Sequence, residues 1–235
     1  MVQLLSSNSF SQTERMLKRL VFFTSIALIF LAFCLLLYAQ PEKSTEKGSY
    51  SIFFMDQKVG YEEYSWQADE DGYVLSVKGR LTKPVRMEIT RLYIRMNKSF
   101  IPTRFEFKGS VSGVSQEISS NLVGGRAENV VRVAGQEQQT VVKIKRDAFL
   151  LPNPVFSPYM VITKKFSCTM KAPLELSAYI IPQMESPFTL EPDEETPCAL
   201  IMTLGSTQVE LVTDESGILK AINIPSQNLR ITRDR

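Results

Sequence analysis

The sequence predicts an all-β fold: a strongly curved antiparallel sheet of about 10–12 strands that forms a half-barrel, with one short helix on its concave face and one transmembrane helix before it. Three observations lead to this prediction. Most of the chain alternates between short segments of apolar-polar period two and turn residues, one segment carries helix-start signals, and one long run near the N-terminus has no charge. A period of two is typical of a half-buried strand.

The uncharged run covers residues 20–38. At about 1.5 Å per residue a helix of this length spans about 28 Å, close to the thickness of a bilayer's hydrocarbon core, about 30 Å. Arg15, Lys18 and Arg19 precede the run, whereas charges of both signs follow it. The positive-inside tendency therefore predicts a cytoplasmic arm 1–19, a signal anchor 20–38, a tether 39–48 and an extracytoplasmic domain 49–235. We expect a single-pass protein of the inner cell membrane with a periplasmic domain.

Two other interpretations of the apolar run stay open. A cleaved signal peptide would end at Leu37-Tyr38-Ala39, although Leu37 is large for the third residue before a cleavage site. A lipoprotein signal would use Cys34, although the bulky Phe33 stands where a small residue is needed. All three interpretations place the domain outside the cytoplasm.

Beyond the tether the chain reads as short strands joined by turns, the pattern of an antiparallel meander. The segment 73–81 is the clearest strand, because Tyr73, Leu75, Val77 and Leu81 lie on one face and Val74, Ser76, Lys78 and Arg80 on the other. An acidic-glycine turn, 69–72, precedes it. The expected strands include 50–55, 59–68, 73–81, 86–97, 114–123, 128–133 and 140–145 before the helix, and 174–181, 199–204, 208–213 and 218–224 after it.

One segment, 158–165, predicts a helix. Ser157 is a good N-cap, Pro158 suits the first helical position, and Lys164 and Lys165 suit the C-terminal end. Two turns are not stable alone in water, so the helix must pack on the sheet. It either completes the core or covers a cavity for an apolar ligand. The residues expected to line such a cavity are Trp66, Phe105, Phe107, Phe156, Tyr159, Met160 and Ile162.

Three cysteines are present, and Cys34 lies in the apolar run. In an oxidising compartment Cys168 and Cys198 are candidates for a disulfide, which on the chain-entropy model would stabilise the domain by about 3–4 kcal/mol. Two buried free thiols are the alternative.

Composition limits the chemistry. The absence of histidine removes Ser-His and Cys-His nucleophile pairs and histidine metal sites, and the acidic residues cluster in predicted turns. We therefore expect no enzyme, no cofactor and no metal. A net charge of +2 gives no reason to expect a nucleic-acid partner. Arg91 and Arg104, on adjacent predicted strands, are candidates for binding an anionic head group, the alternative being a solvated sheet face.

Several short motifs resemble a family of exported half-barrel domains. They are the second strand 58–64 (KVGYEEY), the acidic-glycine turn 69–72, the Asn-Pro and Ser-Pro helix region 153–165, and the ending 213–225 (TDESGILKAINIP). The layout is similar to that of lipoprotein carriers and of uncharacterised bacterial domains assigned to glycolipid binding. The resemblance implies a curved sheet whose apolar concave face holds an acyl chain, and it carries over no site residue.

The expected function is therefore the binding of a lipid or another apolar ligand by a membrane-anchored domain. The alternative is a non-catalytic scaffold that binds a protein partner in an envelope complex, its concave face filled by its own side chains.

Overall fold

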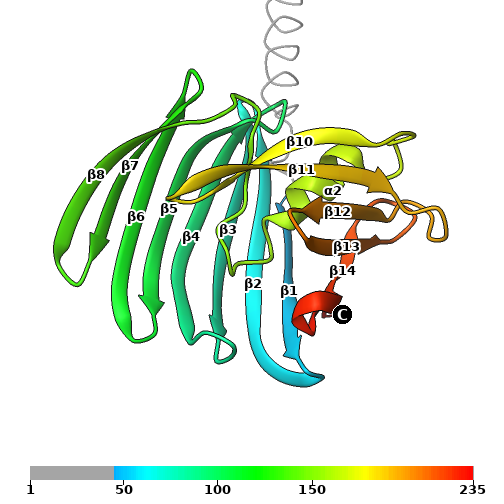
Figure 1. Cartoon of the computed structure of the whole chain (residues 1–235), viewed down its shortest axis with the longest axis horizontal. Coiled ribbons are helices and arrows are strands. Elements are labelled where there is room, and N and C mark those ends of the chain that lie inside the picture. Colours follow the sequence, from blue (N-terminus) through cyan, green and yellow to red (C-terminus); the bar gives the residue numbers. More distant parts are fainter. Residues whose placement is uncertain (1–44, 235) are drawn as a thin grey trace, which may run out of the picture. The chain divides into compact units, whose positions relative to one another are not determined.

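The computed structural model describes residues 45–234, which form one 15-stranded sheet. The sheet has two wings that meet where the first strand pairs with the last (Figure 1). The N-terminal wing is a meander in which each strand pairs with the next in sequence. Its strands are β1 (Thr45–Phe54), β2 (Gln57–Asp69), β3 (Gly72–Leu81), β4 (Met87–Asn97), β5 (Pro102–Val111), β6 (Val114–Val123), β7 (Arg126–Val133) and β8 (Gln136–Lys143).

The C-terminal wing is built from shorter strands and returns the chain to β1. Its strands pair antiparallel except β9, which runs parallel to β10. Helix α2 (Tyr159–Phe166) stands between β9 and β10 in sequence. The strands are β9 (Phe149–Leu150), β10 (Leu174–Ile180), β11 (Met184–Pro192), β12 (Leu200–Leu204), β13 (Thr207–Thr213), β14 (Leu219–Ile224) and β15 (Leu229–Arg233), with a short 3-10 helix, η1 (Pro225–Gln227), before the last.

Local turn chemistry explains the hairpins of the N-terminal wing. Between β2 and β3, Asp69 Oδ1 accepts hydrogen bonds from the backbone N–H groups of Asp71 and Gly72, both at 2.9 Å. Gly72 has a φ of 150°, a conformation that residues with a Cβ rarely adopt. The acidic-glycine turn predicted at 69–72 is therefore confirmed.

A buried carboxylate fixes the segment that leads into α2. Glu62 of β2 has no exposed surface. Its Oε1 accepts a hydrogen bond from the Phe156 N–H at 2.8 Å, and its Oε2 accepts from the Ser157 N–H at 2.7 Å and from the Ser157 hydroxyl at 2.5 Å. Ser157 therefore bonds to the sheet, and the prediction that it caps the helix is wrong, because α2 has no side-chain cap.

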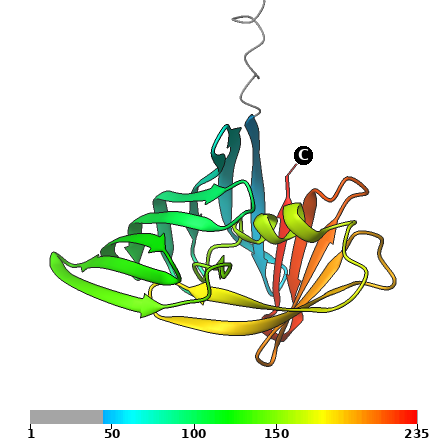
Figure 2. The same cartoon turned by 90° about the horizontal axis from the view of Figure 1, so that it is seen from above.

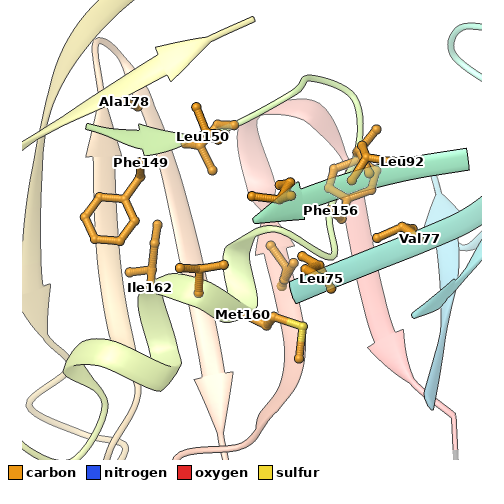
Figure 3. Packing of buried hydrophobic residues seen from close by; sticks show 14 of the residues in the cluster. Leu75, Val77, Leu92, Phe149, Leu150, Phe156, Met160, Ile162 and Ala178 are labelled. Carbon is orange, nitrogen blue, oxygen red and sulfur yellow. The ribbon is translucent and has the colours of Figure 1, made fainter. Parts of the chain in front are cut away.

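The apolar core lies around α2 and the segment before it. Figure 2 shows α2 between the two wings. Phe156, Met160 and Ile162 are at most 3% exposed, and they pack among the apolar side chains of both wings (Figure 3). Phe149 of β9 belongs to the same core, and its ring meets the ring of Phe188 edge-on, with the two ring centres 6.1 Å apart.

A polar contact also joins the two wings. Asn129 of β7 is 2% exposed, and its Nδ2 donates to the hydroxyl oxygen of Tyr179 of β10 at 2.8 Å. Its Oδ1 accepts from the Ser120 hydroxyl at 2.6 Å. The buried amide is therefore satisfied on both sides, as a buried polar group must be.

The fold prediction was right in its all-β class and in its short helix, but it was wrong about the sheet. The described residues form 15 strands, not 10–12, and the sheet is not strongly curled into a half-barrel. The sequence prediction had no strand where β9 lies, and the core between the wings is filled by Phe149, Phe156, Met160 and Ile162.

The membrane prediction is corrected as well. The predicted anchor 20–38 lies outside the described residues, as do the arm 1–19 and most of the tether, whose residues 45–48 belong to β1. Among residues 45–234 no helix has the length and apolar character needed to cross a bilayer. The structure therefore does not support a single-pass anchor or an inner-membrane location.

The predicted disulfide is present: Cys168, just after α2, is bonded to Cys198, just before β12, with their Cα atoms 4.2 Å apart. It ties the end of the helix to the C-terminal wing. The neighbouring Ser167 hydroxyl donates to the Cys198 carbonyl oxygen at 2.5 Å, so a hydrogen bond joins the same two segments.

Replacing Glu62 with alanine leaves two buried N–H groups and a hydroxyl without their acceptor. We expect Glu62→Ala to lower the free energy of unfolding by about 2–4 kcal/mol, measured by urea denaturation. The neighbouring Glu63, on the opposite face, provides the matched control, and Glu63→Ala should change stability by less than about 0.5 kcal/mol. Equal effects of the two substitutions would contradict the role given to Glu62.

Burial raises the pKa of the Glu62 carboxyl above its ordinary value of 4.5, although the hydrogen bonds from Ser157 and Phe156 oppose this shift. The folded state therefore holds this proton more tightly than the unfolded chain, and the contribution of Glu62 to stability falls as the pH rises from 4.5 through the folded pKa. Glu62→Gln does not titrate. The free energy of unfolding of the unmodified protein, minus that of Glu62→Gln, should therefore decrease as the pH rises from 4.5 through the folded pKa. A difference that stays constant or increases would show that the pKa of Glu62 is not raised.

Removing the disulfide with Cys168→Ser and Cys198→Ser should lower the free energy of unfolding by about 3–4 kcal/mol, because the unfolded chain regains the freedom of the closed loop. Dithiothreitol should destabilise the unmodified protein by a similar amount and leave the double variant unchanged. If dithiothreitol destabilised the unmodified protein and the double variant equally, its effect would not come from the Cys168–Cys198 disulfide.

Candidate functional site

A groove of about 970 Å³ lies on the face of the sheet opposite the core. Its position follows from strand alternation: Ser49, Glu63 and Ser65 each neighbour a core residue in sequence, so they point to the other face. The groove crosses the junction of the two wings. It is lined by Lys47, Gly48, Ser49, Glu63, Tyr64, Ser65, Ser76, Val77, Lys78, Arg91, Leu92, Ile218, Lys220, Arg233 and Asp234.

Five basic residues and two acidic ones, Glu63 and Asp234, line the groove, although the Arg233 side chain lies on the core face, over the Tyr64 ring. Three of the bases have partners: Arg91 Nη2 lies 3.1 Å from Glu106, Lys220 Nζ 2.9 Å from Asp214, and Arg233 Nη2 3.3 Å from Glu46. The other two, Lys47 and Lys78, form no ion pair with any residue from 45 to 234. These two unpaired lysines are the cations of the groove that favour an anionic ligand.

Asp234 holds the rim of the groove in place. Its Oδ1 accepts from the Ser51 hydroxyl at 2.6 Å and its Oδ2 from the Ser49 hydroxyl at 2.7 Å. These bonds, led by that from Ser51, lower the pKa of the Asp234 carboxyl. The carboxylate of Asp234, the residue after β15, is thus tied to β1 and keeps its negative charge.

A second charged cluster lies at the C-terminal end of α2. Lys164 Nζ lies 2.7 Å from Glu46 Oε2 and 5.1 Å from the centre of the Trp66 ring. Glu46 Oε1 also accepts from the Tyr64 hydroxyl at 3.1 Å. Burial alone would raise the pKa of Glu46, but the hydrogen bond and the charge of Lys164 lower it. These groups satisfy one another, so the cluster joins α2 to the sheet and offers no free ligand.

The structure brings the predicted cavity residues together, but as packed side chains. Trp66, Phe105, Phe107, Phe156, Met160 and Ile162 belong to the core, and Tyr159 packs against it partly buried. A cavity of only about 10 Å³ remains beside α2, between residues that include Ile94, Phe149 and Val161. Ligand sites usually have volumes of about 300 Å³ or more.

The two predicted head-group arginines occupy different places. Arg91 lines the groove, whereas Arg104 is not among the residues that line it. Both arginines pair with Glu106, Arg91 at 3.1 Å and Arg104 at 2.6 Å. Sequence reasoning missed the two unpaired lysines. The alternation of 73–81 does place Lys78 on the polar face, but Lys47 had been assigned to the tether, and nothing local shows that the ends of the domain meet.

No clustering of three or more cysteine, aspartate or glutamate side chains suited to a metal ion occurs between residues 45 and 234. The sequence contains no histidine to activate the serines of the groove, and Ser49 donates its hydroxyl hydrogen bond to the Asp234 carboxylate at 2.7 Å.

No family model and no curated protein matches the chain. Among solved structures, the chain is similar to the crystal structure of a DUF1089 family protein from Pseudomonas aeruginosa. The two share 10% sequence identity over 80% of this chain and 95% of that one, with a TM-score of 0.41. That neighbour belongs to an uncharacterised family, and the likeness does not extend to lipoprotein carriers. At this TM-score it carries no argument about function.

Proposed function

We propose that residues 45–234 form a non-enzymatic binding domain that holds an anionic amphiphile, such as a lipid with a charged head group, in the groove across the two wings. The observation that carries the proposal is the pair of lysines, Lys47 and Lys78, that line the groove and form no ion pair with any residue from 45 to 234. Electrostatic complementarity of this kind selects ligands by sign.

The size of the groove supports an organic ligand in preference to a free ion. About 970 Å³ lies within the range of small-molecule sites and far exceeds the volume of an inorganic anion. Ile218 and the aliphatic stems of the lysines provide apolar contact for the body of the ligand.

The packed core argues against a ligand inside the domain. An acyl chain beneath α2 would have to displace side chains such as Phe156 and Ile162, which are at most 3% exposed. Each large core side chain that loses its packing costs about 2–5 kcal/mol, whereas each buried methylene of the ligand returns about 0.8 kcal/mol. The proposal therefore places the ligand on the outer face.

A scaffold that binds an envelope protein is the second candidate, and the same packed core favours it. The outer edge of β8 pairs with no described strand, and an extended segment of a partner could add to it. The charge of the groove distinguishes the two candidates, because strand addition at β8 does not require it.

The test compares two amphiphiles that have the same apolar chain and opposite charge. Isothermal titration of the full-length chain with dodecyl phosphate, below its critical micelle concentration, should show binding at least about tenfold tighter than with dodecyltrimethylammonium. Ser76→Trp places an indole in the groove and should weaken binding about tenfold or more.

Ser115→Trp, on the exposed surface of β6 and outside the groove, is the matched control and should bind as the unmodified protein does. Circular dichroism spectra and unfolding midpoints establish that both variants fold. The proposal would be overturned if the two amphiphiles bound equally or if neither bound. The scaffold would be favoured if the groove stayed empty and the protein bound an extended partner peptide at β8.

A further inference from the structure

The floor of the groove has an ordered arrangement of side chains across three strands. In the first row Lys47 of β1 pairs with Ser65 of β2, and Ser65 pairs with Ser76 of β3. In the next row Ser49 pairs with Glu63, and Glu63 pairs with Lys78. Directly paired residues have Cβ atoms about 4.5–5.5 Å apart, so these side chains form one continuous patch.

One hydroxyl in this patch lacks a partner. The Ser65 Oγ is buried, and it makes no hydrogen bond in the part of the chain that the structure describes. Buried polar atoms are nearly always bonded, because leaving one unbonded costs free energy. Because Ser65 lies between Lys47 and Ser76, the missing hydrogen-bond partner of its hydroxyl would be an oxygen atom of a ligand bound on the patch.

The donors around Ser65 define the chemistry of that ligand. The Lys47 and Lys78 ammonium groups are both exposed and without an ion-pair partner among residues 45–234. Two ammonium groups and two serine hydroxyls can together donate to several oxygens of one group, which suits the tetrahedral array of a phosphate better than the two oxygens of a carboxylate.

We propose that Lys47, Ser65, Ser76 and Lys78 form a subsite for a phosphate group, which is the part of the ligand that the groove recognises. This inference rests on the proposed function and names the chemical group that it requires. Glu63 borders the subsite on the side of Lys78 and repels a fully charged phosphate, so it limits the affinity.

Four sets of variants test the subsite by titration with dodecyl phosphate. Replacing Lys47 and Lys78 together by glutamine should weaken binding at least about tenfold, because two charge-assisted contacts are lost. Replacing Lys98 and Lys143 by glutamine changes the net charge equally, but both are exposed lysines outside the groove, so that variant should bind normally. Glu63→Gln should strengthen binding about two- to fivefold, since a like charge is removed.

Ser65→Ala provides the sharpest readout, because its two effects have opposite signs. Removing a buried hydroxyl that has no partner should leave the unfolding midpoint unchanged or raise it, whereas phosphate binding should weaken about fivefold. A purely structural Ser65 would lose stability and keep its affinity. Inorganic phosphate alone distinguishes the source of the group: competition at similar affinity points to free phosphate, and failure to compete points to an esterified head group.

The outcomes separate the subsite from the function. If dodecyl phosphate binds and Ser76→Trp blocks it, but the Lys47, Lys78 and Ser65 variants bind normally, the subsite is wrong and the groove remains the binding place. If dodecyl phosphate does not bind the unmodified chain, both proposals fail.

Discussion

The position of Glu62 is the constraint on which the interior depends. Its carboxylate lies on the core face of β2 and accepts hydrogen bonds from Phe156 and Ser157, more than ninety residues further along the chain. No water-facing alternative exists for these groups, because Glu62 and Ser157 are fully buried. The three donors reduce the cost of burying the carboxylate without cancelling it, since its pKa stays raised, and they hold the segment before α2 in one place against β2. That placement fixes where Met160 and Ile162 enter the core.

The filled core decides which face of the sheet is free for function. With α2 held on the inner face, side chains from both wings close around it, and Asn129 and Tyr179 join the wings by a hydrogen bond. On the outer face lie the residues that alternate with the core residues along each strand. Many of them are serines and charged residues, and the groove forms among them. A sheet with one packed face and one polar face is the ordinary outcome for antiparallel strands. The hydrophobic content of the sequence therefore describes the core and says little about the ligand.

The sequence was sufficient for features that depend on neighbouring residues and insufficient for those that depend on distant ones. The alternation of Tyr73, Leu75 and Val77, the turn at Asp69 and the position of α2 were all predictable, because each is set within a few residues. The two-residue strand β9 is followed by Pro152 and Pro154 and is too short for any periodicity. The role of Glu62 was hidden, since Glu62 and Glu63 look alike in sequence and only the register of β2 tells which one faces the core. The groove was equally hidden, because β1 and β15 meet across about 180 residues.

This long-range pairing links the binding surface to the completion of the fold. Lys47 comes from the first strand, and Arg233 and Asp234 come from the end of the last, so the groove exists only after the two ends of the domain have paired. Pairings of such high sequence separation carry a larger loop-closure cost than the hairpins of the same sheet. Asp234 reduces the freedom of the junction by accepting from Ser49 and Ser51 of β1. An anionic ligand in contact with residues of both strands would add attraction across the same junction, so binding would stabilise the contact that closes the sheet.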